Sequence, residues 1–432
     1  MSGDYSRKRF NPEKHYQGVL RQQGRVDLDA DWNEYVDLQD RRWRAETIDV
    51  VGRSGVPDET PDGFKIAVSG GELTVGQGRM YVDGYVAENH GTAPAFEPTL
   101  EEGYGTAALP VKNQPYGGPV TVPAQVRSLV YLDVWRREVT HLQAPDLIEP
   151  AVNVDSTTRY QTAWQVRVLA NIPPDITCDT PLSDIPGWPT GNRSSSARLT
   201  TTTVAVTTEP DPCLVPPTGG YRGLENHLYR VEVHSATTTT AKVKGPRENP
   251  QRTTSLREKP AGRADVRMES LGRDDVLRIK TGDWVELTSD QREFAGLPGE
   301  MRKVTVDDAN QTLTFSPALP AADFPQGVVD AAKHVRVIRW DQSGIVRKPD
   351  GSQLINLDLT SDGLIELSAA NPSFVLELGV QATLTVLAGG TAHSGDYWCF
   401  AARTADADIE RLNQAPPLGI HHHHAHLAII EP

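Results

Sequence analysis

Short segments in which apolar and polar residues alternate fill most of the chain after residue 60, and turn-favouring residues separate them. The clearest is GGELTVGQGRMYVDGYVAEN at 70–89, where apolar and polar residues alternate around Gly-containing turns, as in a β-hairpin. Two longer segments, at 126–140 and 159–170, carry aromatic residues that we expect to be buried. No internal repeat of about 20–50 residues is evident, so neither a solenoid nor a propeller is expected.

One segment has the periodicity of a helix instead. From Asp27 to Val51, apolar side chains recur about every 3.6 residues and form one stripe, although Gln39 interrupts it. The residues of this stripe are Leu28, Trp32, Tyr35, Val36, Trp43 and Val50. Acidic residues crowd the start of the segment, and two glycines and a proline follow its end. A stripe with two tryptophans and a tyrosine needs a partner surface, either in its own protein or in a neighbour.

Together these signals predict a mainly β chain with an N-terminal arm and one long helix, followed by several small antiparallel β-domains of barrel or sandwich type. The expected segments are an arm and helix at 1–58, a first β-domain at 59–172, a long loop at 173–218, a second β-domain at 219–345 and a C-terminal β-region at 346–432. Within the second β-domain, residues of about 271–342 have the strand count of a small SH3-like or OB-like barrel.

Composition narrows the class of protein. The 432 residues contain 43 Lys and Arg against 57 Asp and Glu, a net charge of −14, which argues against nucleic-acid binding. No window is apolar enough to span a bilayer, and the N-terminus lacks the apolar core of a secretory signal, so we expect a protein made in the cytoplasm. The three cysteines lack metal-binding spacing, and a bridge between Cys178 and Cys213 is left open.

Motifs of the common enzyme classes are missing from the sequence. It contains no G-x-S-x-G, no H-E-x-x-H and no G-x-x-x-x-G-K-[ST]. The carboxylates of Asp27, Asp29 and Asp31 resemble the start of an EF-hand loop, but Trp32 stands where that loop requires glycine. We therefore expect no enzymatic activity and interpret these carboxylates as the acidic start of the helix.

The only concentrated set of metal-ligating side chains is the histidine run HHHHAH near the end of the sequence. Side chains alternate along a strand, so His422, His424 and His426 are expected on one face and His421 and His423 on the other. Three chains on a common axis would together offer six imidazoles to a transition metal such as iron, nickel or zinc. Two other interpretations stay open: a purification tag, although the run is interrupted and LAIIEP follows it, and a polar strand end with hydrogen-bonded histidines.

Long blocks of the sequence resemble an uncharacterised family that is encoded beside phage tail-like contractile injection systems. The most specific block is the opening FNPEKHYQGVLRQQGRVDLDADWNE at 10–34. Further blocks are GQGRMYVDGYVAEN (76–89), VYLDVWRREVTHLQAPDLIEPAV (130–152), TAWQVRV (162–168), GGYRGLENHLYRVEVH (219–234), SLGRDDVLRIKTGDWVEL (270–287), RWDQ (339–342), SGDYWCFAART (394–404) and GIHHHHAHLA (419–428). They follow one another in order, so the resemblance covers nearly the whole chain.

The resemblance implies a structural, non-catalytic part of a contractile tail apparatus, in the baseplate or at the attachment of a tail fibre. It implies other tail or baseplate proteins as partners, a homotrimer that follows the symmetry of the tail, and a particle that can be released from the cell. The chain departs from the family at 237–262, where TTTTAKVKGPRENPQRTTSLREKPAG replaces an aromatic run before an Asn-Gly turn. The family's closing histidine pair matches His422 and His423, whereas His424 stands in place of a tyrosine.

Two functions follow as hypotheses. In the first, residues 10–51 form an anchoring arm whose helix docks on a neighbouring tail protein through Trp32, Tyr35, Val36 and Trp43. In the second, the chain is a glycan-binding adhesin of a tail fibre that recognises a cell-surface glycan through tryptophans of its strands. These tryptophans are Trp135, Trp164, Trp284, Trp340 and Trp398, each in an alternating segment where burial is usual. The two hypotheses require exposed aromatic side chains in different parts of the chain.

Overall fold

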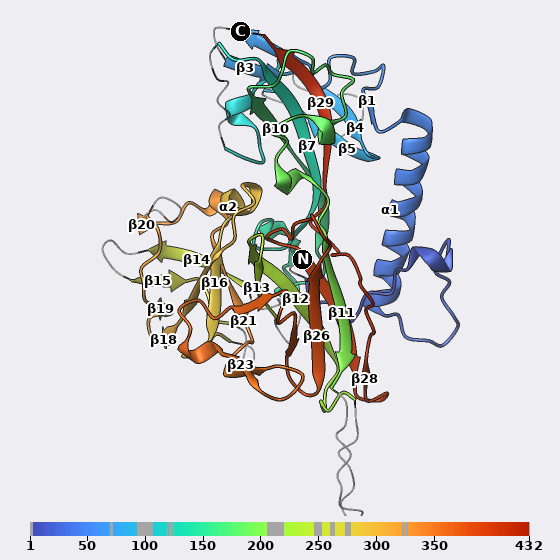
Figure 1. The fold of residues 1–432 in the computed structure, drawn as a ribbon. Helices are drawn as coiled ribbons and strands as arrows, with labels where there is room; N and C mark the ends of the chain where they lie inside the picture. Colours follow the sequence, from blue (N-terminus) through green and yellow to red (C-terminus); the bar gives the residue numbers. More distant parts are fainter. Residues whose placement is uncertain are drawn as a thin grey trace, which may run out of the picture.

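The protein is mainly β, with one long helix near the N-terminus, as the sequence predicts (Figure 1). The computed structural model describes residues 3–69, 72–92, 107–118, 120, 123, 125–204, 220–245, 253–259, 264–272, 278–321, 324 and 327–431. The strands form several antiparallel sheets, which group into a first β-domain, a sandwich and a nearly closed barrel.

Helix α1 (Asp29–Val51) stands at one side of the molecule (Figure 1). Asp29 and Asp31 lie in its first turn, where carboxylates favour the positive end of the helix dipole. The backbone N–H of Ser6 donates to a carboxylate oxygen of Asp29 at 2.8 Å, which ties the N-terminal arm to the start of the helix. The helix ends at Gly52, whose φ of 96° is readily adopted only by glycine.

The first β-domain is built from three small sheets around one core. Their strands are β1 (Ser54–Gly55), β4 (Gly78–Val82) and β5 (Tyr85–Asn89); β2 (Ile66–Ser69), β3 (Glu72–Val75) and β6 (Leu109–Pro110); and β10 (Arg159–Ala170), β7 (Ser128–Val139) and β29 (His422–Ile430). The predicted hairpin is present: β4 and β5 are joined by a turn through Asp83 and Gly84, both with positive φ. Trp164 and Phe64 meet edge to face in the core.

The sandwich packs two five-stranded sheets on a shared apolar core. One sheet has the order β11 (Ala197–Thr203), β26 (Val380–Val386), β25 (Ser373–Val375), β22 (Ile345–Arg347) and β23 (Gln353–Asn356). The other has the order β24 (Ile365–Ser368), β13 (Thr240–Lys244), β12 (His227–Ala236), β27 (Tyr397–Arg403) and β28 (Asp408–Ile409). Tyr229 and Phe400 stack within this core at 5.7 Å between ring centroids.

The barrel is inserted between strands β13 and β22 of the sandwich. Its strands are β14 (Thr253–Lys259), β15 (Asp265–Met268), β16 (Trp284–Thr288), β17 (Glu300–Lys303), β18 (Thr305–Asp307), β19 (Thr312–Thr314), β20 (Gly327–Val328) and β21 (Arg336–Trp340), and the short helix α2 (Asp290–Phe294) follows β16. It begins earlier than the predicted 271–342, because β14 and β15 belong to the same sheet.

The remaining elements are short. They are the strands β8 (Ile148–Glu149) and β9 (Val154–Asp155) and the 3-10 helices η1 (Pro12–Lys14), η2 (Val111–Asn113), η3 (Pro145–Leu147), η4 (Leu182–Asp184), η5 (Thr190–Asn192), η6 (Ala331–Lys333) and η7 (Leu357–Leu359).

Some strands pair with strands from a different segment of the predicted domain organisation. Strand β11 lies inside the expected loop 173–218 and pairs with β26, and residues of that loop such as Ile185 and Trp188 pack on one face of β7. The last strand, β29, returns to the first β-domain and pairs with β7. Local periodicity identifies strands but says nothing about partners that are hundreds of residues away, so these pairings are visible only in the structure.

Buried ion pairs fix the barrel against its neighbours. Asp290 of α2 accepts hydrogen bonds from Arg137 of β7 at 2.9 Å and from Arg336 of β21 at 2.7 Å. Lys244 of the sandwich pairs with Glu286 of the barrel, and both side chains are buried. Breaking a buried pair leaves an uncompensated charge, so these contacts hold the parts in one arrangement.

Candidate functional site

Most of the aromatic stripe of α1 faces away from the protein, although Tyr35 and Val36 border a hollow that Tyr85 and Tyr160 also line. Trp32 is 60% exposed, Tyr35 40% and Trp43 65%, and Val50 near the end of the helix is 80% exposed. Val36, the other residue expected in this interface, is partly buried. The rings of Trp32 and Tyr35 lie 6.1 Å apart and form one apolar surface. The structure thus brings the predicted stripe together and leaves most of it in contact with water.

The opposite face of α1 meets the protein through charged side chains. Asp40 forms an ion pair with Arg136 of β7 at 2.9 Å. The guanidinium of Arg44 lies 4.0 Å from the ring centroid of Tyr85 in β5. Only two residues of the helix are fully buried, Ala30 and Leu38. Helix α1 therefore docks on its own protein mainly through polar contacts, and Trp32 and Trp43 of its apolar stripe stay largely exposed.

A partly buried acid and base also lie between α1 and the N-terminal arm. Burial raises the pKa of Asp37, and the nearby positive charges of Lys8 and Arg136 only partly oppose this effect. Burial lowers the pKa of Lys8 on the arm, against the attraction of Asp37. Both shifts arise because a low-dielectric environment disfavours charge.

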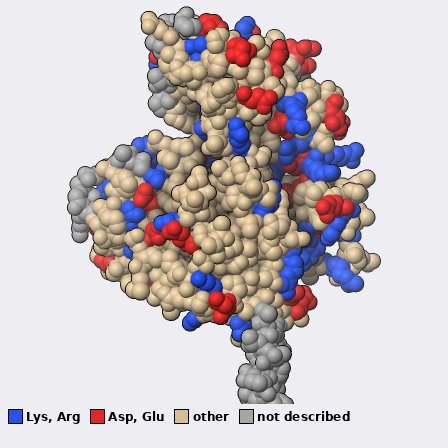
Figure 2. All heavy atoms as spheres, in the orientation of Figure 1, with Lys and Arg blue, Asp and Glu red and all other residues tan. Residues whose placement is uncertain are grey.

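The arm that precedes α1 also exposes apolar side chains. Leu20 and Val26 are almost entirely exposed, and Tyr16 is more than half exposed. Lys, Arg, Asp and Glu side chains are interspersed along the edge of the molecule formed by the arm and α1 (Figure 2). Scattered exposed apolar residues are ordinary, but aromatic residues gathered on one helix face within a charged surround are typical of an interface.

The histidine run forms the start of β29, as the interpretation of a native strand predicts. Strand β29 pairs antiparallel with β7, with His422 opposite Trp135 and His424 opposite Asp133. Ala425 points into the core of the first β-domain. His422 and His424 lie on the other face of the sheet, where their side chains meet that of Asp133.

Asp133, His422 and His424 form a compact cluster that could hold a metal ion. One potential ligand atom from each residue lies within 4.8 Å of the others. The Nδ1 atom of His422 lies 2.7 Å from Oδ1 of Asp133, and Nε2 of His424 lies 3.4 Å from the same oxygen. The other carboxylate oxygen of Asp133 forms an ion pair with Arg167 of β10 at 2.9 Å.

The cluster sits in an aromatic environment. His422 stacks on Trp135 at 5.1 Å between ring centroids. His424 lies 5.3 Å from Trp188 and 5.9 Å from Tyr131 by the same measure. These rings shield the cluster from water on several sides, while the His422 side chain remains 30% exposed.

The protonation states of Asp133 and His424 suit metal binding. Burial favours the neutral form of Asp133, but the hydrogen bond with His422 and the positive charges of His422, Arg167 and His424 outweigh it and lower the pKa of this carboxyl. Burial lowers the pKa of His424 to about 4, despite the attraction of Asp133. An ionised carboxylate and a neutral imidazole are the forms that bind a metal ion.

The other histidines of the run are engaged elsewhere. His426 lies two residues beyond His424 on the same face, opposite Tyr131, and hydrogen-bonds with the backbone of Thr180. His423 faces the other side, where its Nδ1 lies 3.0 Å from a carboxylate oxygen of Asp83. The predicted set of His422, His424 and His426 is therefore only partly brought together. His426 lies opposite Tyr131, two residues before Asp133 in β7, and so it does not join the cluster.

Sequence reasoning missed Asp133. It lies 289 residues before His422, so spacing gives no signal. One signal was available: Asp133 is the only charged residue in the run SLVYLDVW of a long strand. A carboxylate in such a run is almost always paired when buried, and Asp133 is 1% exposed.

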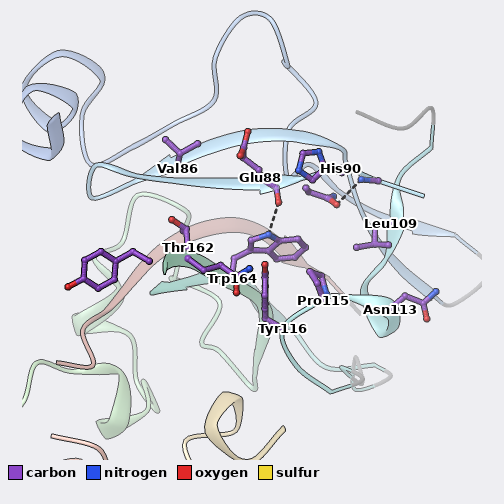
Figure 3. Close-up of a pocket in the computed structure, with 13 residues that line it drawn as sticks. Val86, Glu88, His90, Leu109, Asn113, Pro115, Tyr116, Thr162 and Trp164 are labelled. Atoms are coloured by element: carbon purple, nitrogen blue, oxygen red, sulfur yellow. Dashed lines mark hydrogen bonds between the residues drawn. The ribbon is translucent and has the colours of Figure 1, made fainter. Parts of the chain in front are cut away.

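A pocket of about 670 Å³ lies between β5 and β10 (Figure 3). Its lining includes Tyr116, Tyr160, Asn113 and Gln161. The indole of Trp164 also borders it, but Nε1 of this residue donates to the backbone oxygen of Glu88 at 2.7 Å (Figure 3). Trp164 is therefore held inside the fold and offers little of its ring to a ligand.

The five strand tryptophans named for glycan binding are all buried. Trp135, Trp164, Trp284, Trp340 and Trp398 are each less than 5% exposed. A glycan stacks on the face of an accessible ring, so these residues cannot supply the binding surface in this structure.

The cysteines add no site. Cys178 is a free, exposed thiol, Cys399 is buried, and Cys213 lies outside the described residues. Within the described part of the chain, no helix is both long and apolar enough to cross a membrane.

The fold and these surfaces define a multi-domain β-protein with an outward-facing aromatic helix and a buried His–Asp cluster. The chain belongs to DUF6519, a family of unknown function whose model matches residues 1–183 and 192–415. No curated protein and no solved structure shows significant similarity to the chain. The family description carries no function, so a role in contractile tail systems is a matter for proposal.

Proposed function

We propose that the protein is a non-catalytic structural component of a phage tail-like contractile injection system, a baseplate or fibre-attachment protein. It is held in the particle by the outward face of α1, which docks in an apolar groove of a neighbouring tail subunit. The observation that carries this proposal is the exposed stripe of Trp32, Tyr35 and Trp43 on a helix that contacts its own protein through charged groups.

The energetics of the stripe support a docking role. A tryptophan side chain buries up to about 250 Å², so the exposed 60% of Trp32 offers about 150 Å². At about 25 cal/mol per Å², covering that surface contributes about 3–4 kcal/mol before the cost of ordering the partners. Trp43 offers a similar amount, and two such anchors suffice to centre an interface.

The resemblance to tail-associated proteins points to the same region. The opening block at 10–34 is the most specific of the matching blocks, and it covers the arm and the first turns of α1. The same residues include Leu20, Val26 and Trp32, which expose apolar surface.

The test replaces both tryptophans in the full chain, as Trp32→Ala with Trp43→Ala, in cells that assemble the particle. We expect loss of co-sedimentation with the particle and a dissociation constant higher by about 1,000-fold, because two anchors of about 2 kcal/mol each are removed. The free energy of unfolding of the isolated chain should change by less than about 1 kcal/mol, because both side chains are largely exposed.

Arg41→Ala provides a matched control, since Arg41 is exposed on the same helix but outside the stripe. If the double variant co-sediments with the particle as well as the wild type does, the docking role of α1 is overturned.

Tail symmetry and release from the cell are parts of the same proposal. We propose a homotrimer, made in the cytoplasm and assembled into the particle before the particle leaves the cell. Light scattering on the purified chain tests the trimer.

The His–Asp cluster adds a metal to the proposal. We propose that it binds a transition metal, with iron, nickel and zinc as the candidates, through Asp133, His422 and His424. Imidazole and carboxylate ligands suit these ions. This set replaces the predicted one, since His426 is engaged with Thr180.

A glycan-binding adhesin is the second candidate function. The pocket between β5 and β10 supports it, because Tyr160 is nearly half exposed and the amides of Asn113 and Gln161 line the same pocket. Aromatic rings and amides together are a common recognition surface for hydroxyl-rich ligands. Binding of the full chain to a glycan array, lost on Tyr160→Ala, would favour this function.

A further inference from the structure

The strand that carries the metal-binding histidines is also the one that completes the first β-domain. Among the described strands, β29 pairs with β7 alone and forms an edge of its sheet. Its Ala425 is buried in the core, and Leu427 and Ile430 pack against that core. Separation of β29 from β7 would therefore open the first β-domain.

The three ligands come from the two paired strands. Asp133 belongs to β7, whereas His422 and His424 belong to β29. An ion bound by all three residues is a cross-link between strands that are otherwise held by backbone hydrogen bonds and packing. Such an ion cannot bind all its ligands once β29 has left β7.

One ligand atom of the cluster has no other use. The side chain of His424 is 93% buried, and its Nε2 makes no hydrogen bond with any described residue, so its contact with Asp133 is at ion-pair distance only. A buried polar atom that makes no hydrogen bond costs about 1–3 kcal/mol, and a bond to a metal ion would offset that cost. It points toward Asp133, at 3.4 Å from Oδ1.

The geometry suits a small tetrahedral ion. Bonds of about 2.0–2.1 Å place neighbouring ligand atoms about 3.3 Å apart in a tetrahedral zinc site. The separation of His424 and Asp133 is already close to this value, and a small rotation of His422 would exchange its hydrogen bond with Asp133 for a metal bond. Arg167 holds the second carboxylate oxygen and thereby orients the first. The exposed side of His422 leaves room for water as a fourth ligand.

We propose that Zn²⁺ bound by Asp133, His422 and His424 latches β29 onto β7 and so controls the opening of the first β-domain. This inference rests on the proposal that the cluster binds a transition metal, and it adds the identity of the ion and its effect on the fold. The competing interpretation is a metal-free network in which His422 and Arg167 satisfy Asp133 by themselves.

The experiment starts from the full chain stripped of metal with a chelator. Calorimetric titration with Zn²⁺ measures affinity and stoichiometry, and the visible spectrum with Co²⁺ reports whether the site is tetrahedral. Hydrogen exchange is then followed in peptides covering 128–135 and 422–430, with and without Zn²⁺. At a free concentration of 100 times the dissociation constant, we expect exchange through opening of β29 to slow by about 100-fold, because only the closed form binds the ion.

Two variants with one matched control assign the ligands. His424→Gln and Asp133→Asn should abolish the tight site and the protection by Zn²⁺. His426→Gln makes the same change as His424→Gln on the same strand face but outside the cluster, so it should leave both intact. Circular dichroism shows whether each variant folds, and the wild-type exchange measurement does not depend on any variant.

The outcomes separate the two proposals. Absence of one-to-one binding by the wild-type chain, or binding that survives His424→Gln and Asp133→Asn, overturns the metal site and the latch together. One-to-one binding with unchanged exchange of the β7 and β29 peptides overturns the latch alone and leaves the site. Tight binding with slowed exchange, lost in both cluster variants and kept in the control, supports both.

Discussion

Helix α1 and strand β29 come from opposite ends of the chain, and each directs toward the protein the side chains that usually face water. Helix α1 turns Asp37, Asp40 and Arg44 inward and leaves Trp32 and Trp43 outside. Strand β29 turns His422 and His424 into an aromatic environment, where they meet a buried carboxylate. The helix thus retains an unsatisfied apolar surface and the strand an unsatisfied polar atom. The apolar surface of the helix suits a protein partner, and the polar atom of the strand suits a bound ion.

The largest expected effect concerns the apolar side of β29. Ala425→Asp would place an unpaired carboxylate in the core of the first β-domain, at a cost of about 3–5 kcal/mol. We expect hydrogen exchange in 422–430 to approach that of an open strand. Ala45→Asp on the exposed surface of α1 is the control, with an expected change below about 1 kcal/mol. Equal effects of the two substitutions would mean that β29 is not part of the core.

An intermediate effect tests the polar docking of α1. Arg136→Ala removes the ion pair with Asp40 and the contact of the guanidinium with the Tyr160 ring, 4.1 Å from its centroid. Both contacts are partly exposed, so we expect a loss of about 1–2 kcal/mol, or about 5- to 30-fold faster hydrogen exchange in 29–51. Arg41→Ala should leave the exchange unchanged. If Arg136→Ala leaves hydrogen exchange in 29–51 unchanged, contacts other than those of Arg136 hold the helix on the protein.

The smallest expected effect is a pH dependence from Asp37. Its pKa is raised in the folded state by burial, so the folded protein takes up a proton at this site before the unfolded chain does. The stability contribution of Asp37 is therefore unfavourable at neutral pH, and the penalty is relieved as the pH falls through the raised pKa. The difference in unfolding free energy between wild type and Asp37→Asn should shift in favour of wild type as the pH falls from 7 toward 4.5. A shift in the opposite direction would indicate that the attraction of Lys8 dominates.

Much of this fold follows from local sequence patterns. The 3.6-residue spacing identifies α1, alternation around Gly-containing turns identifies the hairpin of β4 and β5, and strand alternation places His422 and His424 on one face. Each of these signals depends on residues close together in the chain. The sequence pattern does not predict which side of α1 meets the protein, because that depends on Arg136 and Tyr85 in distant strands.

The His–Asp cluster is likewise only partly predictable from local sequence patterns. The sequence indicates two of its three members, but Asp133 joins them only through the register of β29 on β7. That register also explains why His426 is left out, because it lies opposite Tyr131 beside the segment that contains Thr180. Pairing between distant strands is set by the packing of whole faces, for which one short segment carries too little information.

The return of β29 to β7 has a consequence for biosynthesis. Domains generally fold as units, in the order in which they leave the ribosome. Here the first β-domain cannot finish folding in that order, because His422 of its edge strand is translated 289 positions after Asp133 of its central strand. Until residues 422–430 emerge, the backbone groups along one edge of β7 have no partner strand, and an unpaired edge is a template for pairing with other chains.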